Sequence, residues 1–252
     1  MSLNGAPAEW RACSNRDLHA VRSLDMKNRS TLEFASEGVG ILRGVILPAD
    51  ILAVKTEVSL DTESLQRSGI RNLEKRFDSI ARLATSPAVL SIAGSCLGAM
   101  PCLVRALVFD KTPDRNWFVA WHQDKTVTLN RRVDMAGWGP WSLKDGVCHV
   151  QAPCEVLNQM ITIRLHIDPA DEASGCLKVI PGSHRLGVVK QEAIGNIVAR
   201  ENSVPCVVGA GDAVIMRPHV LHSSGKSTGS AHRRVVHLEY SSFALPDGIC
   251  WA

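Results

Sequence analysis

The sequence lacks the features that mark several large classes of protein. Among its 252 residues, no apolar run approaches the roughly 20 residues of a transmembrane helix. No Lys/Arg run is interleaved with aromatic residues, as nucleic-acid-binding surfaces often are. The chain does not begin with a basic segment followed by an apolar one, as secretory signals do. We therefore expect no membrane span, no nucleic-acid partner and a cytoplasmic location.

The eight cysteines form no metal-binding or disulfide pattern. None belongs to a C-x-x-C pair, and they are scattered through apolar runs. This distribution is typical of reduced core thiols in an intracellular protein. The net charge of +3 is only mildly basic and does not indicate a polyanionic partner.

Turn residues divide the chain into a helical first part and a strand-rich second part. One helix is predicted over 88–97, after Ser86-Pro87 and before Gly98. Beyond residue 101, short apolar runs alternate with Gly, Pro and Asp clusters. About eight short strands of this kind favour an all-β barrel or jelly roll with helices packed outside. We expect one domain over 1–252, with mainly helical support in 1–100 and the jelly-roll core in 101–245.

Residues 131–158 are expected to form a long loop, because they contain Gly137, Gly139, Pro140, Gly146 and Pro153. A long loop inside a compact domain usually covers or contributes to a site. His149 lies in this segment and is therefore a candidate for contacting substrate.

A pair of polar residues near the end of an apolar run indicates half of a metal site. His122 and Asp124 are two residues apart, so on a strand their side chains point to the same face, with Cα atoms about 6.5 Å apart. An imidazole and a carboxylate placed in this way can bind one ion, but a third ligand must come from elsewhere. His222, in LHSSG, is a candidate. Taken alone, the pair is more often an ordinary polar pair at a strand end than part of a metal site.

Several motifs occur in a recognisable order. They are WHQD (121–124), SGCLKVIPGSHRLG (174–187), GAGDAVIM (209–216), LHSSG (221–225) and HRR (232–234). With these motifs the chain resembles the phytanoyl-CoA dioxygenase family of Fe(II)/2-oxoglutarate oxygenases. The resemblance implies a mainly β, cupin-like double-stranded β-helix with N-terminal and flanking α-helices. It also implies that the cofactors are Fe(II), 2-oxoglutarate and O2.

The resemblance assigns roles to individual residues. The metal ligands would be His122, Asp124 and His222, which bind one face of Fe(II) and leave three positions open. The family places an arginine eleven residues after the distal histidine, which is Arg233 here, to bind the far carboxylate of 2-oxoglutarate. Arg234 is the fallback, because the two side chains point to opposite faces of their strand. The hydroxyl of Ser224 would assist the same carboxylate.

Two arginines lie inside apolar strand patterns. Arg105 and Arg164 must each be paired or face a polar cavity, because an isolated buried charge is very costly. Each is a candidate for binding an anionic substrate or the inner carboxylate of 2-oxoglutarate. The alternative for each is a structural salt bridge.

The implied activity is oxidation, most simply hydroxylation, of an unactivated C–H bond in a small polar or specialised metabolite, with release of succinate and CO2. Related halogenases replace the carboxylate ligand with a small residue, so Asp124 disfavours halogenation. Two alternatives remain: a cupin-like metalloenzyme that does not use 2-oxoglutarate, and a non-catalytic binding barrel. Arg233 and Ser224 argue against the first, and the complete ligand set argues against the second.

Overall fold

The computed structural model describes residues 32–60, 70–71, 73–144 and 146–252 and is built around two antiparallel sheets. The larger sheet has the strand order β1-β11-β8-β13-β3-β2, with bounds Val39–Leu42, Ala213–Met216, Met160–His166, Arg233–Ser241, Cys102–Lys111 and Ile70–Arg71. The smaller sheet has the order β10-β9-β12-β4, with bounds Val204–Pro205, Leu177–Val179, His222–Ser224 and Val119–His122. This arrangement confirms the expected mainly β jelly roll.

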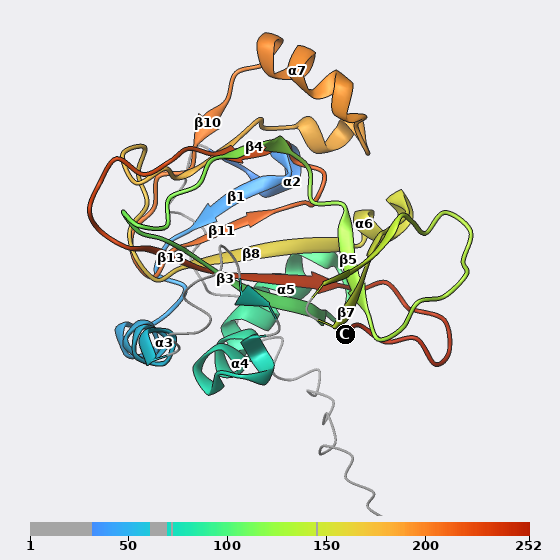
Figure 1. The fold of residues 1–252 in the computed structure, drawn as a ribbon, viewed down its shortest axis with the longest axis horizontal. Helices are drawn as coiled ribbons and strands as arrows, with labels where there is room; N and C mark the ends of the chain where they lie inside the picture. Colours follow the sequence, from blue (N-terminus) through green and yellow to red (C-terminus); the bar gives the residue numbers. More distant parts are fainter. Residues whose placement is uncertain (1–31, 61–69, 72, 145) are drawn as a thin grey trace, which may run out of the picture.

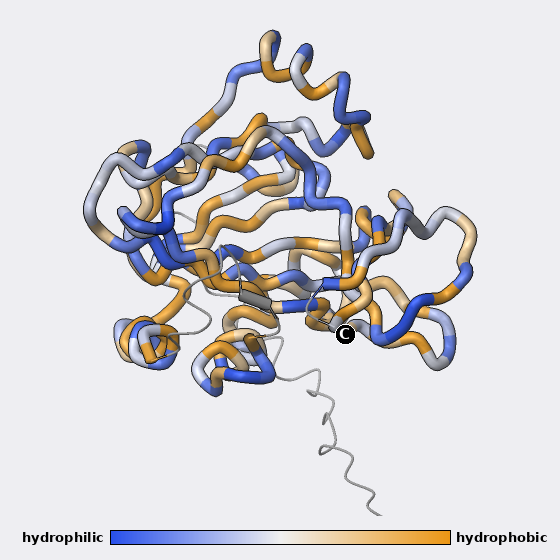
Figure 2. The backbone as a smooth tube through the Cα atoms, in the orientation of Figure 1, coloured by the Kyte–Doolittle hydropathy of each residue, from blue (hydrophilic) through white to orange (hydrophobic). Residues whose placement is uncertain are grey.

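The larger sheet has one apolar face and one polar face, because successive strand side chains point in opposite directions. On β8 and β13 the residues that join the main apolar cluster are Ile161, Ile163, Leu165, Val236, Leu238 and Tyr240. Their alternating neighbours include Arg164, His166, Arg233, His237 and Glu239, all buried. In Figure 2 the strands of this sheet carry hydrophobic colour interrupted by hydrophilic stretches. The polar row is therefore a buried feature, separate from the solvated surface.

Three helices cover the apolar face of the larger sheet (Figure 1). They are α3 (Pro48–Leu60), α4 (Asp78–Ala84) and α5 (Pro87–Leu97). The start and end predicted for α5 are confirmed: the Ser86 side chain accepts a hydrogen bond from the Val89 amide, and Gly98 ends the helix with φ +68°. Among the described residues no single helix could cross a membrane, and only the bent pair α4 and α5 meets the length and composition required.

Leu73, Phe77, Ile80 and Leu83 have the spacing of one amphipathic helix, but they do not lie in one continuous helix. Leu73 lies in a 3-10 turn, η2 (Leu73–Lys75), and Phe77 is extended before α4 begins. Leu73, Ile80 and Leu83 nevertheless pack in the same apolar cluster. The spacing therefore reflects contact with a shared core, which a turn and a short helix satisfy as well as one long helix would.

The prediction of a long loop over 131–158 is wrong for much of that segment. A third antiparallel sheet has the order β5-β7-β6, with bounds Thr126–Leu129, Val147–Gln151 and Trp141–Lys144, and a short helix, α6 (Cys154–Asn158), follows. Gly146, at φ +76°, lies between β6 and β7. Asp145-Gly146 is a typical two-residue hairpin sequence. Gly146 thus lies between two short paired strands, which replace part of the single long loop expected from the sequence.

Candidate metal and cosubstrate site

The structure brings together the three predicted metal ligands. His122 on β4 and His222 on β12 are cross-strand partners. One oxygen of Asp124 lies 3.7 Å from His122 Nε2, and the other lies 3.6 Å from His222 Nε2. One donor atom from each residue lies within 4.8 Å of the other two. The pairing of β4 with β12 thus places a distant residue beside the local His-x-Asp pair.

Backbone carbonyls orient both imidazoles. His122 Nδ1 lies 2.8 Å from Ala120 O, and His222 Nδ1 lies 2.9 Å from Val220 O. A carbonyl oxygen only accepts hydrogen bonds, so each Nδ1 carries the proton and donates it. Each Nε2 is left with its lone pair directed towards the Asp124 side. Outer hydrogen bonds of this kind commonly orient metal-binding histidines.

The charges at this cluster also suit a divalent metal. Burial raises the pKa of Asp124, but His222 and His122 outweigh it and hold that pKa well below its usual value. Burial lowers the pKa of His222 to about 4, with the charge of His122 also contributing. At neutral pH the cluster therefore offers an anionic carboxylate and at least one neutral imidazole. Two imidazoles and one carboxylate are a donor set that Fe(II) oxygenases use.

Gln123, the third residue of WHQD, holds this strand end in place. Its side-chain nitrogen donates to Gly187 O at 2.8 Å and to His219 O at 2.7 Å, and its oxygen accepts from the Val189 amide at 2.8 Å. These bonds tie the segment between His122 and Asp124 to two other loops. The sequence reading did not assign Gln123 a role, although its place between the two ligands was a usable signal.

The two neighbouring arginines have different environments. Arg234 forms a two-bond pair with Asp168, at 2.7 and 3.1 Å. Arg233 is 2% exposed, and its Nε and Nη1 have no hydrogen-bond partner within the described residues. A buried guanidinium with unsatisfied donors suits a carboxylate ligand. The geometry therefore favours Arg233 over Arg234, and its cosubstrate role stays a prediction.

A lysine that the sequence reading missed lies opposite Arg233. Lys111 on β3 is its cross-strand partner on β13. Lys111 Nζ donates to Ser224 Oγ at 2.7 Å and to Gly225 O at 2.5 Å. Burial, together with the charges of Arg233 and Arg164, lowers the pKa of Lys111 to about 7. Lys111 ends an apolar strand, and alternation from Arg105 places it on the same face as that arginine.

The three predicted substrate-binding residues lie in one buried polar network. Arg105 Nη2 donates to Glu239 Oε1 at 2.8 Å, and its Nη1 lies 3.5 Å from His149 Nδ1. Arg164 Nη1 lies 2.8 Å from His237 Nδ1. The pair with Glu239 matches the salt-bridge alternative for Arg105. A substrate role for Arg105, Arg164 or His149 stays a prediction, and His149 belongs to β7 and not to a loop.

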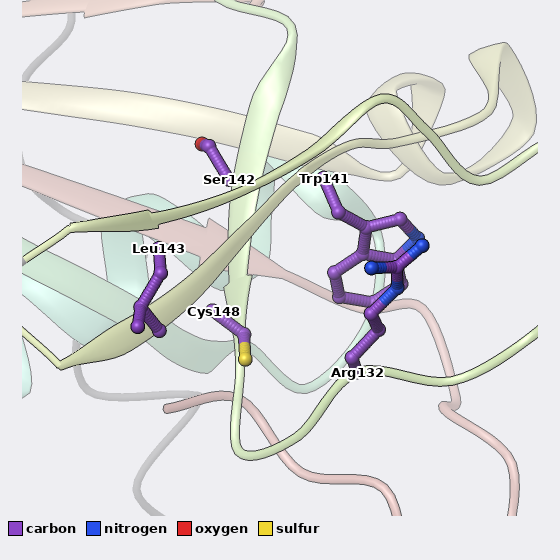
Figure 3. Close-up of a pocket in the computed structure, with 5 residues that line it drawn as sticks. All are labelled: Arg132, Trp141, Ser142, Leu143 and Cys148. Atoms are coloured by element: carbon purple, nitrogen blue, oxygen red, sulfur yellow. The ribbon is translucent and has the colours of Figure 1, made fainter.

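A separate pocket of about 240 Å³ lies at the third sheet. It is lined by Arg132, Trp141, Ser142, Leu143 and Cys148. In Figure 3, Arg132 and Trp141 lie at one end and Leu143 at the other. Cys148 and His149 are consecutive on β7 and so point to opposite faces of the sheet. This pocket contains none of the predicted site residues.

Two curated relatives share moderate sequence similarity with the chain. The L-proline trans-4-hydroxylase of Streptomyces griseoviridis is 25% identical over 192 residues, which cover 66% of this chain and 64% of that protein. The 2-aminoethylphosphonate dioxygenase of Uncultured bacterium HF130_AEPn_1 is 28% identical over 85 residues, which cover 32% of each. The matched regions thus span less than two thirds of either relative.

Solved structures and a family model complete the comparison. AviO1 from Streptomyces viridochromogenes Tue57 has a TM-score of 0.64 and 21% identity, covering 86% of this chain and 99% of its own. SnoK, a non-heme alpha ketoglutarate dependent carbocyclase from nogalamycin biosynthesis, has a TM-score of 0.65 and 14% identity, covering 94% and 87%. These likenesses show a shared fold. The model of the phytanoyl-CoA dioxygenase (PhyH) family matches residues 62–235, and the chain belongs to this family.

Proposed function

We propose that this protein is an Fe(II)- and 2-oxoglutarate-dependent dioxygenase that hydroxylates a C–H bond of a small polar or specialised metabolite. The observation that carries the proposal is the buried guanidinium of Arg233, whose Nε and Nη1 are unsatisfied within the described residues. Its cross-strand partner Lys111 hydrogen-bonds Ser224, which lies two residues after the predicted ligand His222 on β12. A metalloenzyme without a carboxylate cosubstrate has no evident use for such a cation, which argues against a cupin-like enzyme that does not use 2-oxoglutarate.

Each polar group near Arg233 has a part in this proposal. His122, Asp124 and His222 would hold Fe(II), which when bound supplies the dioxygen chemistry that protein side chains lack. Arg233 binds the far carboxylate of 2-oxoglutarate through its planar fork of donors. Lys111 supplies a second positive charge and fixes the Ser224 hydroxyl beside it. Gln123 keeps the ligand-bearing strand end in position.

The substrate class is proposed from the relatives and from the retained ligand. Two relatives act, by name, on L-proline and on 2-aminoethylphosphonate, which are small polar molecules. Neighbours in fold include a carbocyclase and an epimerase from nogalamycin biosynthesis, a specialised pathway. These likenesses support a small polar or specialised metabolite. Asp124 stands at the carboxylate position, which supports hydroxylation over halogenation.

An anaerobic titration tests the proposal. Purified protein is loaded with Fe(II) and then with 2-oxoglutarate, and the visible charge-transfer band of the chelate is followed. We expect a band in the wild type, no band in His222→Ala, and at least tenfold weaker 2-oxoglutarate binding in Arg233→Gln. Arg200→Gln, a change at an exposed arginine of α7 (Gln191–Arg200), serves as the control. Folded, iron-loaded wild type that gives no band would contradict the proposal.

A further inference from the structure

The hydrogen bonds of His237 define its tautomer. Arg164 Nη1 lies 2.8 Å from His237 Nδ1, and an arginine only donates, so Nδ1 accepts. The ring proton is therefore on Nε2, which donates to Glu239 Oε1 at 3.1 Å. Burial also lowers the pKa of His237, which favours the neutral ring. His237 is thus a neutral bridge between a cation and an anion.

The charge of Glu239 is matched by a different arginine. Arg105 Nη2 lies 2.8 Å from Glu239 Oε1, and both side chains are buried. Arg164 reaches Glu239 only through the uncharged His237. The buried network therefore contains one direct ion pair, and it leaves Arg164 without a carboxylate of its own.

Arg164 has only uncharged direct contacts within the described residues. Its guanidinium lies 5.4 Å from the centre of the Phe109 ring and bonds His237, while its Nε has no hydrogen-bond partner there. Arg164 is 6% exposed, so water can satisfy few of its hydrogen-bond donors. A buried guanidinium with an unsatisfied donor carries a desolvation cost that an acceptor from a ligand would offset.

A charge count leaves excess positive charge around Arg164 once the proposed metal and cosubstrate are bound. Arg164, Arg233 and Lys111 influence one another electrostatically, and Asp124 is the carboxylate that acts on Arg164. A divalent metal and dianionic 2-oxoglutarate cancel each other. Arg164 then retains a positive charge that Asp124, as a metal ligand, balances only in part.

The position of Arg164 separates it from the Arg233 carboxylate site. Arg164 is the cross-strand partner of His237, and Arg233 lies four residues earlier on β13. Four strand residues span roughly 13 Å. The backbone of Arg164 is thus well removed from that of Arg233, although its side chain extends into the same interior.

We propose that Arg164 binds an anionic group of the substrate, a carboxylate or similar oxyanion, and that His237 holds the guanidinium in place for it. The inference rests on the proposed function and narrows the substrate to an anion. The planar guanidinium pairs with such a group through two parallel hydrogen bonds. The inner carboxylate of 2-oxoglutarate has the same chemistry, so the test separates the two sources.

The test uses acetate as a minimal anion and acetamide as its neutral counterpart. Protein saturated with Fe(II) and 2-oxoglutarate is titrated anaerobically, and the thermal denaturation midpoint and the visible band are followed. Acetate is expected to raise the midpoint of the wild type with saturation in the millimolar range, and acetamide is not. Arg164→Gln, which keeps one donor for His237, is expected to weaken acetate binding at least tenfold. Arg200→Gln is expected to behave as wild type.

Three results would overturn the inference. They are no acetate stabilisation in the wild type, equal stabilisation in Arg164→Gln, and a tenfold loss of 2-oxoglutarate affinity in Arg164→Gln, which would assign Arg164 to the cosubstrate. If Arg164→Gln does not fold, Arg164→Lys replaces it. This variant keeps the positive charge but cannot form two parallel hydrogen bonds to a carboxylate, so we expect weaker acetate binding. If the wild type gives no band, the proposed function fails, and acetate titration of iron-loaded protein alone still tests Arg164.

Discussion

Arg233 and Lys111 lie directly opposite each other on the adjacent antiparallel strands β13 and β3, and both are almost completely buried. Like charges at directly opposed strand positions are destabilising. The arrangement is therefore unfavourable in the protein alone and becomes favourable when a carboxylate lies between the two cations. On the proposed assignment, this pair links the stability of the fold to binding of the cosubstrate.

Replacing Lys111 should separate these two effects. In Lys111→Met we expect 2-oxoglutarate binding to weaken by tenfold or more, because one of the two cations is lost. A tenfold change in affinity corresponds to about 1.4 kcal/mol. The thermal midpoint of the metal-free protein should not fall, since a buried cation facing Arg233 has been removed. Lys178→Met, at a half-buried lysine of β9 that pairs with Glu172, is the control. Unchanged 2-oxoglutarate affinity would refute a cosubstrate role for Lys111.

The affinity for 2-oxoglutarate should depend on pH. Burial and the neighbouring arginines lower the pKa of Lys111 to about 7 in the free protein, and a bound dianion raises it. Binding is therefore accompanied by uptake of a proton when the pH lies between 7 and the higher pKa that Lys111 has in the complex. Affinity is flat below pH 7 and falls as pH rises above it, by at most about tenfold per unit for a single proton. Band titrations from pH 6.5 to 9 measure this slope, on the order of one proton, and Lys111→Met should abolish it.

Arg105 is predicted to stabilise the folded protein, because it forms an ion pair with the buried carboxylate of Glu239. Arg105→Leu should lower the free energy of unfolding by about 3–5 kcal/mol, since removing one partner leaves an unpaired buried charge. The double variant Arg105→Leu/Glu239→Leu should recover much of this loss. Chemical denaturation of both variants measures the difference. A stable Arg105→Leu protein with impaired turnover would instead favour the substrate-binding alternative.

Gln123 is predicted to act through the metal ligands on either side of it. Gln123→Ala removes two hydrogen bonds donated to carbonyls and one accepted from the Val189 amide. We expect Fe(II) affinity to fall about 10–100-fold, as is common when groups that support metal ligands are lost. Competition with a chelator measures this. Gln123→Glu keeps the acceptor for Val189, so intermediate affinity is expected, whereas full affinity in both variants would show that Gln123 does not position the ligands.

The sequence alone determined the features that depend on local spacing. The His-x-Asp spacing placed His122 and Asp124 near each other, although β4 ends at His122, and alternation along a strand separated Arg233 from Arg234. Turn residues correctly marked α5 and the series of short strands beyond residue 101. The ordered motifs indicated the family, which the model match over 62–235 confirms. The assignments of individual residues to iron and 2-oxoglutarate stay predictions.

Only the tertiary structure decided which residues meet across strands. Pairing of β3 with β13 places Lys111 opposite Arg233 and Arg105 opposite Glu239, and pairing of β8 with β13 places Arg164 beside His237. Periodicity in the sequence predicts the face that a residue occupies, but it does not contain the register between strands far apart in the chain. Register follows from how both sheets bury their apolar faces together, so the charge balance of the interior emerges only in the folded protein.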